Sequence, residues 1–317
     1  MGQPVPVLEV AIALGLFVVG AALAVWATER LLDGLVLLAV LTGLSTFAVG
    51  AALSGFEAEN VAVGLAAAFH GGAPIALGTV FGGATFLVCI ALGLGAILYP
   101  IQVRLPTGFL VVLAVSPLLP GLAVFGQQTS RLAGVVLLIA FAVFMAYLIL
   151  ASRGHKFMES EEVREAADER PAWPAALGTT ALGLVAVGVG GELVATGASR
   201  IIATLGIPAL LMGMVITPAA IEIEEVIRQA VPTREGHPEV SAGNLIGTML
   251  YFTLFNLGLI ALIAPVAVDP RVWQLDWPFL VGVTWLATLF LARGRVGRVE
   301  GSLLVLCYVA YVALHVI

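Results

Sequence analysis

Phe56-Glu57-Ala58-Glu59-Asn60 and Ile221-Glu222-Ile223-Glu224-Glu225 are two acidic stretches that interrupt apolar runs, and we call them the first and the second acidic segment. Adding 165 to a residue number carries the first segment onto the second, and the same offset carries Gly78 onto Gly243 and Gly82 onto Gly247. A carboxylate at membrane depth costs at least a few kcal/mol unless it is neutralised, paired or bound to a cation. Two such clusters at equivalent places predict an internal duplication with one shared cation site.

The chain around these segments has the composition of a membrane protein. Of its 317 residues, 61% are hydrophobic and 11% are charged, and the mean hydropathy is +1.09. The apolar runs are mostly about twenty residues long, as a spanning helix requires, whereas barrel strands would alternate over about ten residues. We therefore predict an all-α integral membrane protein that crosses the cell membrane many times and has no nucleic-acid partner.

Ten apolar segments are expected to span the bilayer. Their approximate ranges are 7–26, 35–69, 74–98, 108–126, 131–151, 174–204, 207–231, 239–266, 277–293 and 300–317. One long hydrophilic stretch, residues 153–173, separates the first five segments from the last five. The sequence thus predicts a first five-helix repeat over 1–152, a polar linker over 153–173 and a second five-helix repeat over 174–317.

An odd number of helices per repeat would place the second repeat upside down relative to the first. The Lys and Arg residues assigned to loops agree with such inverted repeats, because eleven fall on one side and three on the other. The eleven are Arg30, Arg104, Arg153, Lys156, Arg164, Arg170, Arg228, Arg234, Arg293, Arg295 and Arg298, and the three are Arg131, Arg200 and Arg271. The positive-inside rule then puts both termini outside and the linker in the cytoplasm. Inverted repeats with a site at their interface are typical of transporters.

Each acidic segment follows residues that weaken a helix, Ser54-Gly55 in one case and Thr217-Pro218 in the other. Proline removes a backbone donor and glycine weakens the helix, so nearby carbonyl groups are freed. We predict broken helices at a central site. Carbonyl and carboxylate oxygens are hard ligands, which favour Ca²⁺, Na⁺ or Mg²⁺ over soft metals.

A glycine-rich motif follows each acidic segment. The two motifs, at 76–83 and 241–248, contain Gly78-Thr79-Val80-Phe81-Gly82-Gly83 and Gly243-Asn244-Leu245-Ile246-Gly247-Thr248. Glycines four residues apart let two membrane helices approach closely, which is a sufficient structural reason for them. The same close approach is expected to bring Thr79, Asn244 and Thr248 next to the carboxylates.

At these residues the sequence resembles the cation/Ca²⁺ exchanger superfamily, which are sodium/calcium exchanger-like membrane proteins. The family repeats carry a Gly-Thr-Ser-Leu-Pro-Glu type motif and, some twenty residues on, a Gly-Asn-x-x-Gly-Ser-Asn type motif. The motif at 243–248 matches the latter well, and the motif at 78–83 matches it loosely. The resemblance implies ten helices in two inverted repeats and a secondary antiporter.

The resemblance leaves two alignments of the acids open. With one extra residue in the intervening loop, Glu59 and Glu224 take the places of the family's central acids, whereas an ungapped alignment selects Asn60 and Glu225. We favour Glu59 and Glu224, because a carboxylate then comes from each repeat. Several polar ligands of the family are replaced, by Thr79, Gly83, Ala84 and Met249. The extra acids Glu57 and Glu222 could restore lost ligands or carry protons.

The function expected from these observations is secondary-active export of Ca²⁺, or of a related hard cation, in exchange for Na⁺ or H⁺ by alternating access. The expected ligands are Glu59, Glu224, Glu57, Glu222, Glu225, Asn60, Ser54, Thr217, Thr79, Asn244 and Thr248. We expect no cofactor, a monomer, and no partners besides inorganic cations and the lipid bilayer. Clustered acids cannot all stay ionised in a dry site, so H⁺ is expected to contribute to coupling.

Two other function classes fit parts of the pattern, namely an intramembrane metal-dependent or acid/base enzyme and a passive cation channel. The sequence has no His-rich metal motif, activated nucleophile or phosphate loop at useful spacing, which favours the antiporter over the enzyme. Some charged residues have a simpler interpretation. Glu225 and Arg228 could form an exposed helix-end pair, and His315 at the chain end suggests no metal cluster.

Overall fold

The structure is a computed structural model that describes residues 7–42, 53, 55–152 and 172–316. Within these residues the chain is helical apart from one ladder of two short strands. Eight of the described helices are long and apolar enough to cross a membrane. The chain is therefore a multi-pass membrane protein, as its composition predicts.

The helices divide into those before and those after the stretch 153–171. Before it lie α1 (Val7–Thr42), α3 (Ala58–Phe69), α4 (Ala73–Phe86), η1 (Leu87–Ala91), α5 (Leu92–Leu98), α6 (Thr107–Val115), η2 (Ser116–Leu118), α7 (Gly121–Val124) and α8 (Arg131–Ala151). After it lie α10 (Trp173–Leu205), α11 (Ala209–Leu211), η4 (Met212–Ile216), α12 (Thr217–Ile221), η5 (Glu222–Glu224), α13 (Glu225–Arg234), α14 (Pro238–Leu250), η6 (Tyr251–Asn256), α15 (Leu257–Ile263), η7 (Val272–Asp276), α16 (Trp277–Ala292) and α17 (Arg298–Val316).

Two continuous spans form the centre of the bundle. The span Ala73–Leu98 joins α4, η1 and α5, and 83% of an 18-residue apolar stretch within it is buried. For the span Pro238–Ile263 the buried share is 78%. The corresponding values are 33% for α1 and 28% for both α8 and α17, so these helices lie at the periphery and present apolar side chains outward. A helix in the bilayer can expose apolar residues to lipid, whereas its backbone groups must be satisfied within the helix.

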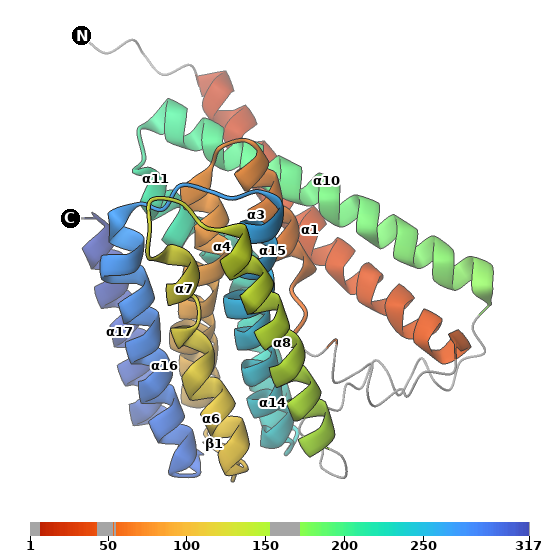
Figure 1. The fold of residues 1–317 in the computed structure, drawn as a ribbon, viewed down its shortest axis with the longest axis vertical. Coiled ribbons are helices and arrows are strands. Elements are labelled where there is room, and N and C mark those ends of the chain that lie inside the picture. The colour runs from red at the N-terminus through yellow and green to blue at the C-terminus, as the bar shows by residue number, and fades with distance from the viewer. Residues whose placement is uncertain (1–6, 43–52, 54, 153–171, 317) are drawn as a thin grey trace.

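The long helices α1 and α10 lie side by side and cross the other helices diagonally (Figure 1). They are antiparallel, because Phe17 faces Gly197 while Gly34, further along α1, faces Thr180. A Cβ atom added at Gly34 or at Gly197 would collide with backbone atoms of the other helix. Glycine is needed at these positions because it lets the two backbones approach closely.

The first predicted span has different limits in the structure. Helix α1 continues unbroken to Thr42, whereas the sequence predicted one span at 7–26 and the next at 35–69. The charged residues near its middle stay on the helix surface, where Arg30 Nη1 lies 3.0 Å from Asp33 Oδ2. Such a pair one turn apart is compatible with a continuous helix. The single segment 35–69 and the assignment of Arg30 to a loop were therefore wrong.

Both acid-bearing helices are interrupted, but in different ways. Before α3, Gly55 takes a left-handed backbone conformation with φ of +75°, and Phe56 and Glu57 are not helical. Around Pro218 the chain stays helical but changes its winding, from the π-helix η4 through α12 to the 3₁₀ turn η5. Pro218 lies inside this continuous helical stretch and has no N–H to bond an earlier carbonyl, which is a physical reason for the change of winding. The predicted break at 217–218 is thus a change of helix type.

Short backbone pairings tie α6 and α7 to α16 at both ends. The strands β1 (Ile101–Gln102) and β2 (Arg295–Val296) are antiparallel, with Ile101 opposite Val296. At the other end of these helices, Gln128 pairs with Ala267 in an isolated bridge. These links hold the outer helices around the central spans, in a fold that is otherwise the predicted helical one.

Candidate cation site

The backbone before α3 places two acids at a helix start. Gly55 accommodates the positive φ, and a Cβ atom there would collide with the backbone of Thr248. Glu57 is the residue that precedes α3, and Glu59 lies in its first turn. The first turn of a helix has free N–H groups and the positive end of the helix dipole, both of which stabilise nearby carboxylates.

The second acidic segment likewise lies at a helix start. Glu222 and Glu224 belong to the 3₁₀ turn η5, and Glu225 is the first residue of α13. Glu222 and Glu225 are completely buried, and the side chain of Glu224 is 18% exposed. The tighter winding of η5 separates α12 from α13 and lets three acids of one short stretch occupy different environments.

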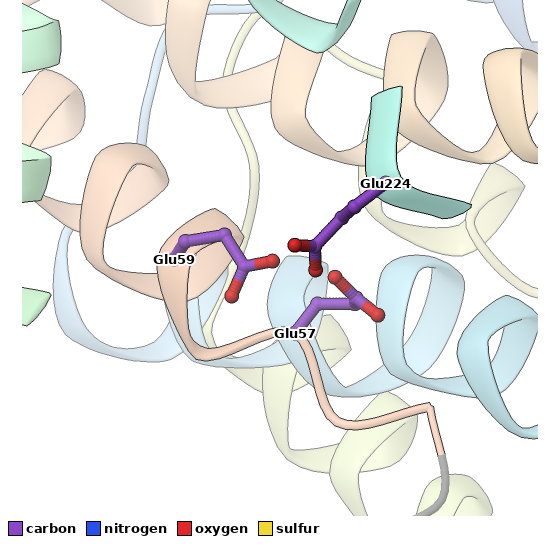
Figure 2. A group of neighbouring side chains, drawn as sticks. All are labelled: Glu57, Glu59 and Glu224. Atoms are coloured by element: carbon purple, nitrogen blue, oxygen red, sulfur yellow. The ribbon is translucent and has the colours of Figure 1, made fainter. Parts of the chain in front are cut away.

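Three carboxylates from the two segments converge (Figure 2). Glu57, Glu59 and Glu224 each contribute one oxygen, and the three oxygens all lie within 4.8 Å of one another. Glu57 is 2% exposed and Glu59 is fully buried. Segments about 165 residues apart in the sequence thus form one acidic cluster, which we call the three-carboxylate cluster.

Glu59 is the least satisfied member of this cluster. Neither of its carboxylate oxygens has a hydrogen-bond partner among the described residues. Glu57 Oε2 is also buried without a partner there. An ionised carboxylate in such a place is strongly disfavoured, so the arrangement requires a cation or a proton.

The remaining members of the two segments form pairs across the same interface. Asn60 Nδ2 donates a hydrogen bond of 2.5 Å to Glu222 Oε1. The offset of 165 carries Asn60 onto Glu225 and Glu57 onto Glu222, so Glu225 and Glu57 form the pair equivalent to Asn60 and Glu222. Two carboxylates cannot donate to one another when both are ionised, and an arginine lies between them.

Arg228 of α13 makes contacts with three carboxylates. Its Nη1 donates to Glu57 Oε1 and to Glu225 Oε1, both at 3.1 Å. Its Nη2 lies 2.6 Å from Glu224 Oε1, a close ion pair that lacks the alignment of a hydrogen bond. The Glu225–Arg228 pair therefore exists, but Glu225 is completely buried and the prediction of an exposed helix-end pair was wrong.

The predicted polar ligands of the glycine-rich motifs differ in their contacts. Asn244 Nδ2 donates to Glu225 Oε2 at 3.1 Å, so it does reach a carboxylate. The Thr79 hydroxyl donates to the carbonyl of Ala76 and accepts from Asn256, so its hydrogen bonds go to groups other than a carboxylate. The hydroxyls of Thr217 and Thr248 are buried without partners in the described part of the chain, and Ser54 lies outside that part.

Sequence reasoning missed two polar features. The first is the role of Arg228, although an arginine three residues after Glu225 inside an apolar run was a visible signal. The second is a buried group in which Tyr311 donates to Asp276 Oδ1 at 2.7 Å and His315 Nε2 lies 3.0 Å from the same oxygen. Asp276 is 35 residues from Tyr311 in the sequence, and His315 alone gave no hint of the group.

The glycines of the first motif have the predicted packing role. A Cβ atom at Gly78 would collide with the backbone of Gly213 in η4, and one at Gly82 would collide with the backbone of Met214. Helix α4 therefore lies directly against the interrupted stretch that leads to the second acidic segment. This close contact packs α4 against the helical stretch that leads to the second acidic segment.

Comparison with known proteins places this geometry in context. Residues 12–150 and 175–317 both match the profile of the family described as "Sodium/calcium exchanger protein". The inner membrane protein YrbG of Escherichia coli is 26% identical over 314 residues, which cover 96% of each chain. The putative antiporter CaxA of Alkalimonas amylolytica is 25% identical over 305 residues, which cover 92% of this chain and 95% of the relative.

The fold also resembles a solved structure. The sodium-calcium exchanger NCX_Mj, soaked with Na⁺ and Sr²⁺, superimposes with a TM-score of 0.59 and is 24% identical in sequence. The match covers 96% of this chain and 98% of the solved one.

Proposed function

Because the chain belongs to the sodium/calcium exchanger family, we propose that it is a secondary-active antiporter that moves Ca²⁺, or a related hard cation, in exchange for Na⁺ or H⁺. The cation would be held by the three-carboxylate cluster and released by alternating access to the two sides of the membrane. Since the family is one of exchangers, the chain is not an enzyme, and the intramembrane enzyme considered from the sequence is set aside.

The observation that carries the proposal is the convergence of Glu57, Glu59 and Glu224 from two distant segments, with Glu59 buried and unpartnered within the described residues. Ca²⁺ binds oxygen ligands at about 2.4 Å, so two ligands of one ion can be at most about 4.8 Å apart. The spacing of the three carboxylate oxygens, all within 4.8 Å, is compatible with this limit.

Three further side chains carry buried neutral oxygens that make no hydrogen bond among the described residues. They are the hydroxyl oxygens of Thr217 and Thr248 and the amide oxygen Oδ1 of Asn60. Ca²⁺ takes six to eight oxygen ligands, which combine carboxylates with carbonyl, amide and water oxygens. We include these three groups in the proposed ligand set, while Glu222 and Glu225 neutralise and position it through Asn60 and Arg228.

We further propose that the protein has ten spanning segments in two inverted five-helix repeats. The family profile matches twice, at 12–150 and 175–317, on either side of the linker 153–173. The eight described spans and the two interrupted acidic stretches together make ten. The antiparallel packing of α1 on α10, and the π-helices η1 and η6 at equivalent places in the two central spans, also support it.

The orientation proposed for these repeats has both termini outside the cell membrane and residues 153–173 in the cytoplasm. The excess of Lys and Arg on one side supports it, although Arg30 and Arg228 do not count toward that excess, because Arg30 lies within α1 and Arg228 lies among the carboxylates. The repeats 1–152 and 174–317 would then form one site at their interface, as inverted-repeat transporters do.

The coupling ion is the finer part of the proposal, and we assign at least part of it to H⁺. Among the described residues, Arg228 is the one arginine that pairs with any of the five acids of the two segments. The hydroxyl of Thr79, a predicted ligand, donates to the carbonyl of Ala76. Fewer neutral ligands are then left for several Na⁺ ions at once. Carboxylates that lose a metal ion in a dry site must take up protons, and metal binding releases them again.

The test is transport by the purified protein in proteoliposomes loaded with Ca²⁺, Sr²⁺ or Mn²⁺. We expect efflux of at least one of these ions when an inward Na⁺ or H⁺ gradient is imposed, and little efflux without a gradient. Equal efflux in the presence and absence of a gradient indicates a channel. Efflux with Na⁺ but none in Na⁺-free buffer under a pH gradient contradicts the assignment of H⁺.

A further inference from the structure

Arg228 is a cation that the proposed site already holds. Its guanidinium contacts Glu57, Glu224 and Glu225, and two of these residues, Glu57 and Glu224, belong to the three-carboxylate cluster. The guanidinium therefore lies beside the place proposed for the transported ion, and it shares two carboxylates with that place.

We propose that Arg228 is a tethered competitor of the transported cation, and that it sets the affinity of the site. It binds the carboxylates when the site is empty and withdraws from at least one of Glu57 and Glu224 when the cation binds. This inference rests on the proposed function, because it takes the three-carboxylate cluster to be the cation site.

The physical reason for competition is charge. A cation coordinated by Glu57 and Glu224 would lie within a few ångströms of the guanidinium, and like charges at that separation in a protein interior repel strongly. The arginine cannot relieve the repulsion by losing a proton, since its guanidinium stays charged in proteins. It can relieve the repulsion only by moving.

The position of Arg228 allows such a movement. Its side chain is 28% exposed, whereas Glu57 and Glu225 are 2% and 0% exposed. The arginine thus reaches the buried carboxylates from the edge of the cluster, and it can withdraw outward without crossing the packed centre. While the site is empty, the same contacts keep Glu57 and Glu225 from being buried without a counter-charge, which would be strongly unfavourable.

The competitor is present in only one of the two acidic stretches. The offset of 165 carries Val63 onto Arg228, and Val63 is a fully buried apolar residue of α3. In the first stretch the neutral amide of Asn60 donates to Glu222 Oε1, so the side chain that reaches across from this stretch is neutral. Arg228 therefore acts on one side of the proposed site and not on both.

The first test compares Ca²⁺ binding by the detergent-purified wild type and the variant Arg228→Gln, measured by isothermal titration calorimetry. Competing ligands of one protein are typically coupled by about 5-fold to 150-fold in affinity, so we expect the variant to bind Ca²⁺ at least about tenfold more tightly. Arg234→Gln is the matched control, because Arg234 is an exposed arginine at the end of the same helix. Its dissociation constant should equal that of the wild type.

The outcomes separate this inference from the proposed function. If the wild type binds Ca²⁺ and Arg228→Gln binds it equally or more weakly, Arg228 is not a competitor and the proposed function stands. If neither protein binds Ca²⁺, the proposed Ca²⁺ site and the inference fall together. If Arg228→Gln does not fold, Arg228→Lys takes its place, because a lysine forms a single point contact and should bind Ca²⁺ more tightly than the wild type.

A second measurement needs no variant and detects the movement itself. Phenylglyoxal modifies accessible arginine side chains, and the extent at Arg228 is read by mass spectrometry of the corresponding peptide. Displacement predicts faster modification of Arg228 at saturating Ca²⁺, with Arg234 unchanged as an internal reference. An unchanged or slower reaction at Arg228 would show that the guanidinium stays on its carboxylates, and the proposal would be wrong.

Discussion

The two acidic segments meet the same problem with different side chains. In the first, Asn60 donates an amide hydrogen bond to Glu222 of the opposite segment. In the second, Glu225 occupies the equivalent position, and Arg228 bridges it to Glu57 of the opposite segment. One cross-segment pair is therefore held by a neutral donor and the other by a full positive charge.

This difference shows that positions related by the offset of 165 need not make equivalent contacts. The backbone offset of 165 is retained through both segments, yet the charge balance is not. Glu59 and Glu224, which the offset of 165 relates, belong to neither pair, although Glu224 also contacts Arg228. Glu59 and Glu224 are thus the same residue at positions related by the offset, whereas the two stabilising pairs differ because asparagine stands at position 60 and glutamate at position 225.

The largest effect is expected when either of the like positions loses its charge. Glu59→Gln and Glu224→Gln keep the side-chain size but remove an anion that a divalent cation requires, so each should reduce Ca²⁺ flux by more than about 100-fold, since even indirect ligand supports cost 10-fold to 100-fold. Flux in proteoliposomes is the measurement, with Glu235→Gln as the control because Glu235 is exposed at the end of α13. Near-normal flux in both variants would contradict one shared site.

The contact between α4 and η4 should be the next most sensitive feature. Gly78→Ala adds a methyl group where the backbone of Gly213 already lies, so α4 and η4 must move apart. Overpacking of this kind costs about 1–3 kcal/mol, and we expect Tm to fall by about 2 °C or more. Gly15→Ala is the matched control, since no atom lies within 4 Å of its added Cβ. Equal melting temperatures for the two variants would mean that the close contact between α4 and η4 does not stabilise the fold.

The inverted relation of the two halves can be tested directly by thiol labelling. With Cys89 and Cys307 replaced by alanine, single cysteines at positions 72, 160 and 235 are reacted with a membrane-impermeant maleimide from each side. We expect position 72 to react only from outside and positions 160 and 235 only from the cytoplasm, because the positive-inside rule orients the loops in this way. Labelling of 72 and 235 from the same side excludes inverted repeats.

The smallest effect should follow from making the two pairs more alike. Asn60→Asp places a second carboxylate at hydrogen-bond distance from Glu222, and two such groups share a proton when no cation is near. Ca²⁺ binding should then release about one more proton than in the wild type. Calorimetry in buffers of different ionisation enthalpy measures this number. Gln128→Glu, an exposed amide-to-acid change, should release no additional proton.

The sequence by itself determined the helical membrane fold, the two acidic segments and the family resemblance. Long apolar runs are sufficient to specify spanning helices, because the bilayer requires backbone hydrogen bonds to be satisfied within each span. A carboxylate that recurs at a fixed offset inside such runs is equally visible, since its burial is too unfavourable to be incidental. The glycine spacing of the first motif also predicted the close packing that Gly78 and Gly82 make.

Only the tertiary structure decided which polar groups meet. Helix α1 extends past its charged residues, and Arg30 and Asp33 pair on its surface, so hydropathy alone misplaced the end of that span. Arg228 was assigned to a loop by its charge, although its position in α13 brings it to carboxylates of both segments. The offset of 165 carries Thr79 onto Asn244, but the Thr79 hydroxyl donates to the carbonyl of Ala76 whereas Asn244 donates to Glu225. These contacts depend on how separate helices pack, and the recurrence at an offset of 165 indicates one shared site without fixing which side chains bond to one another.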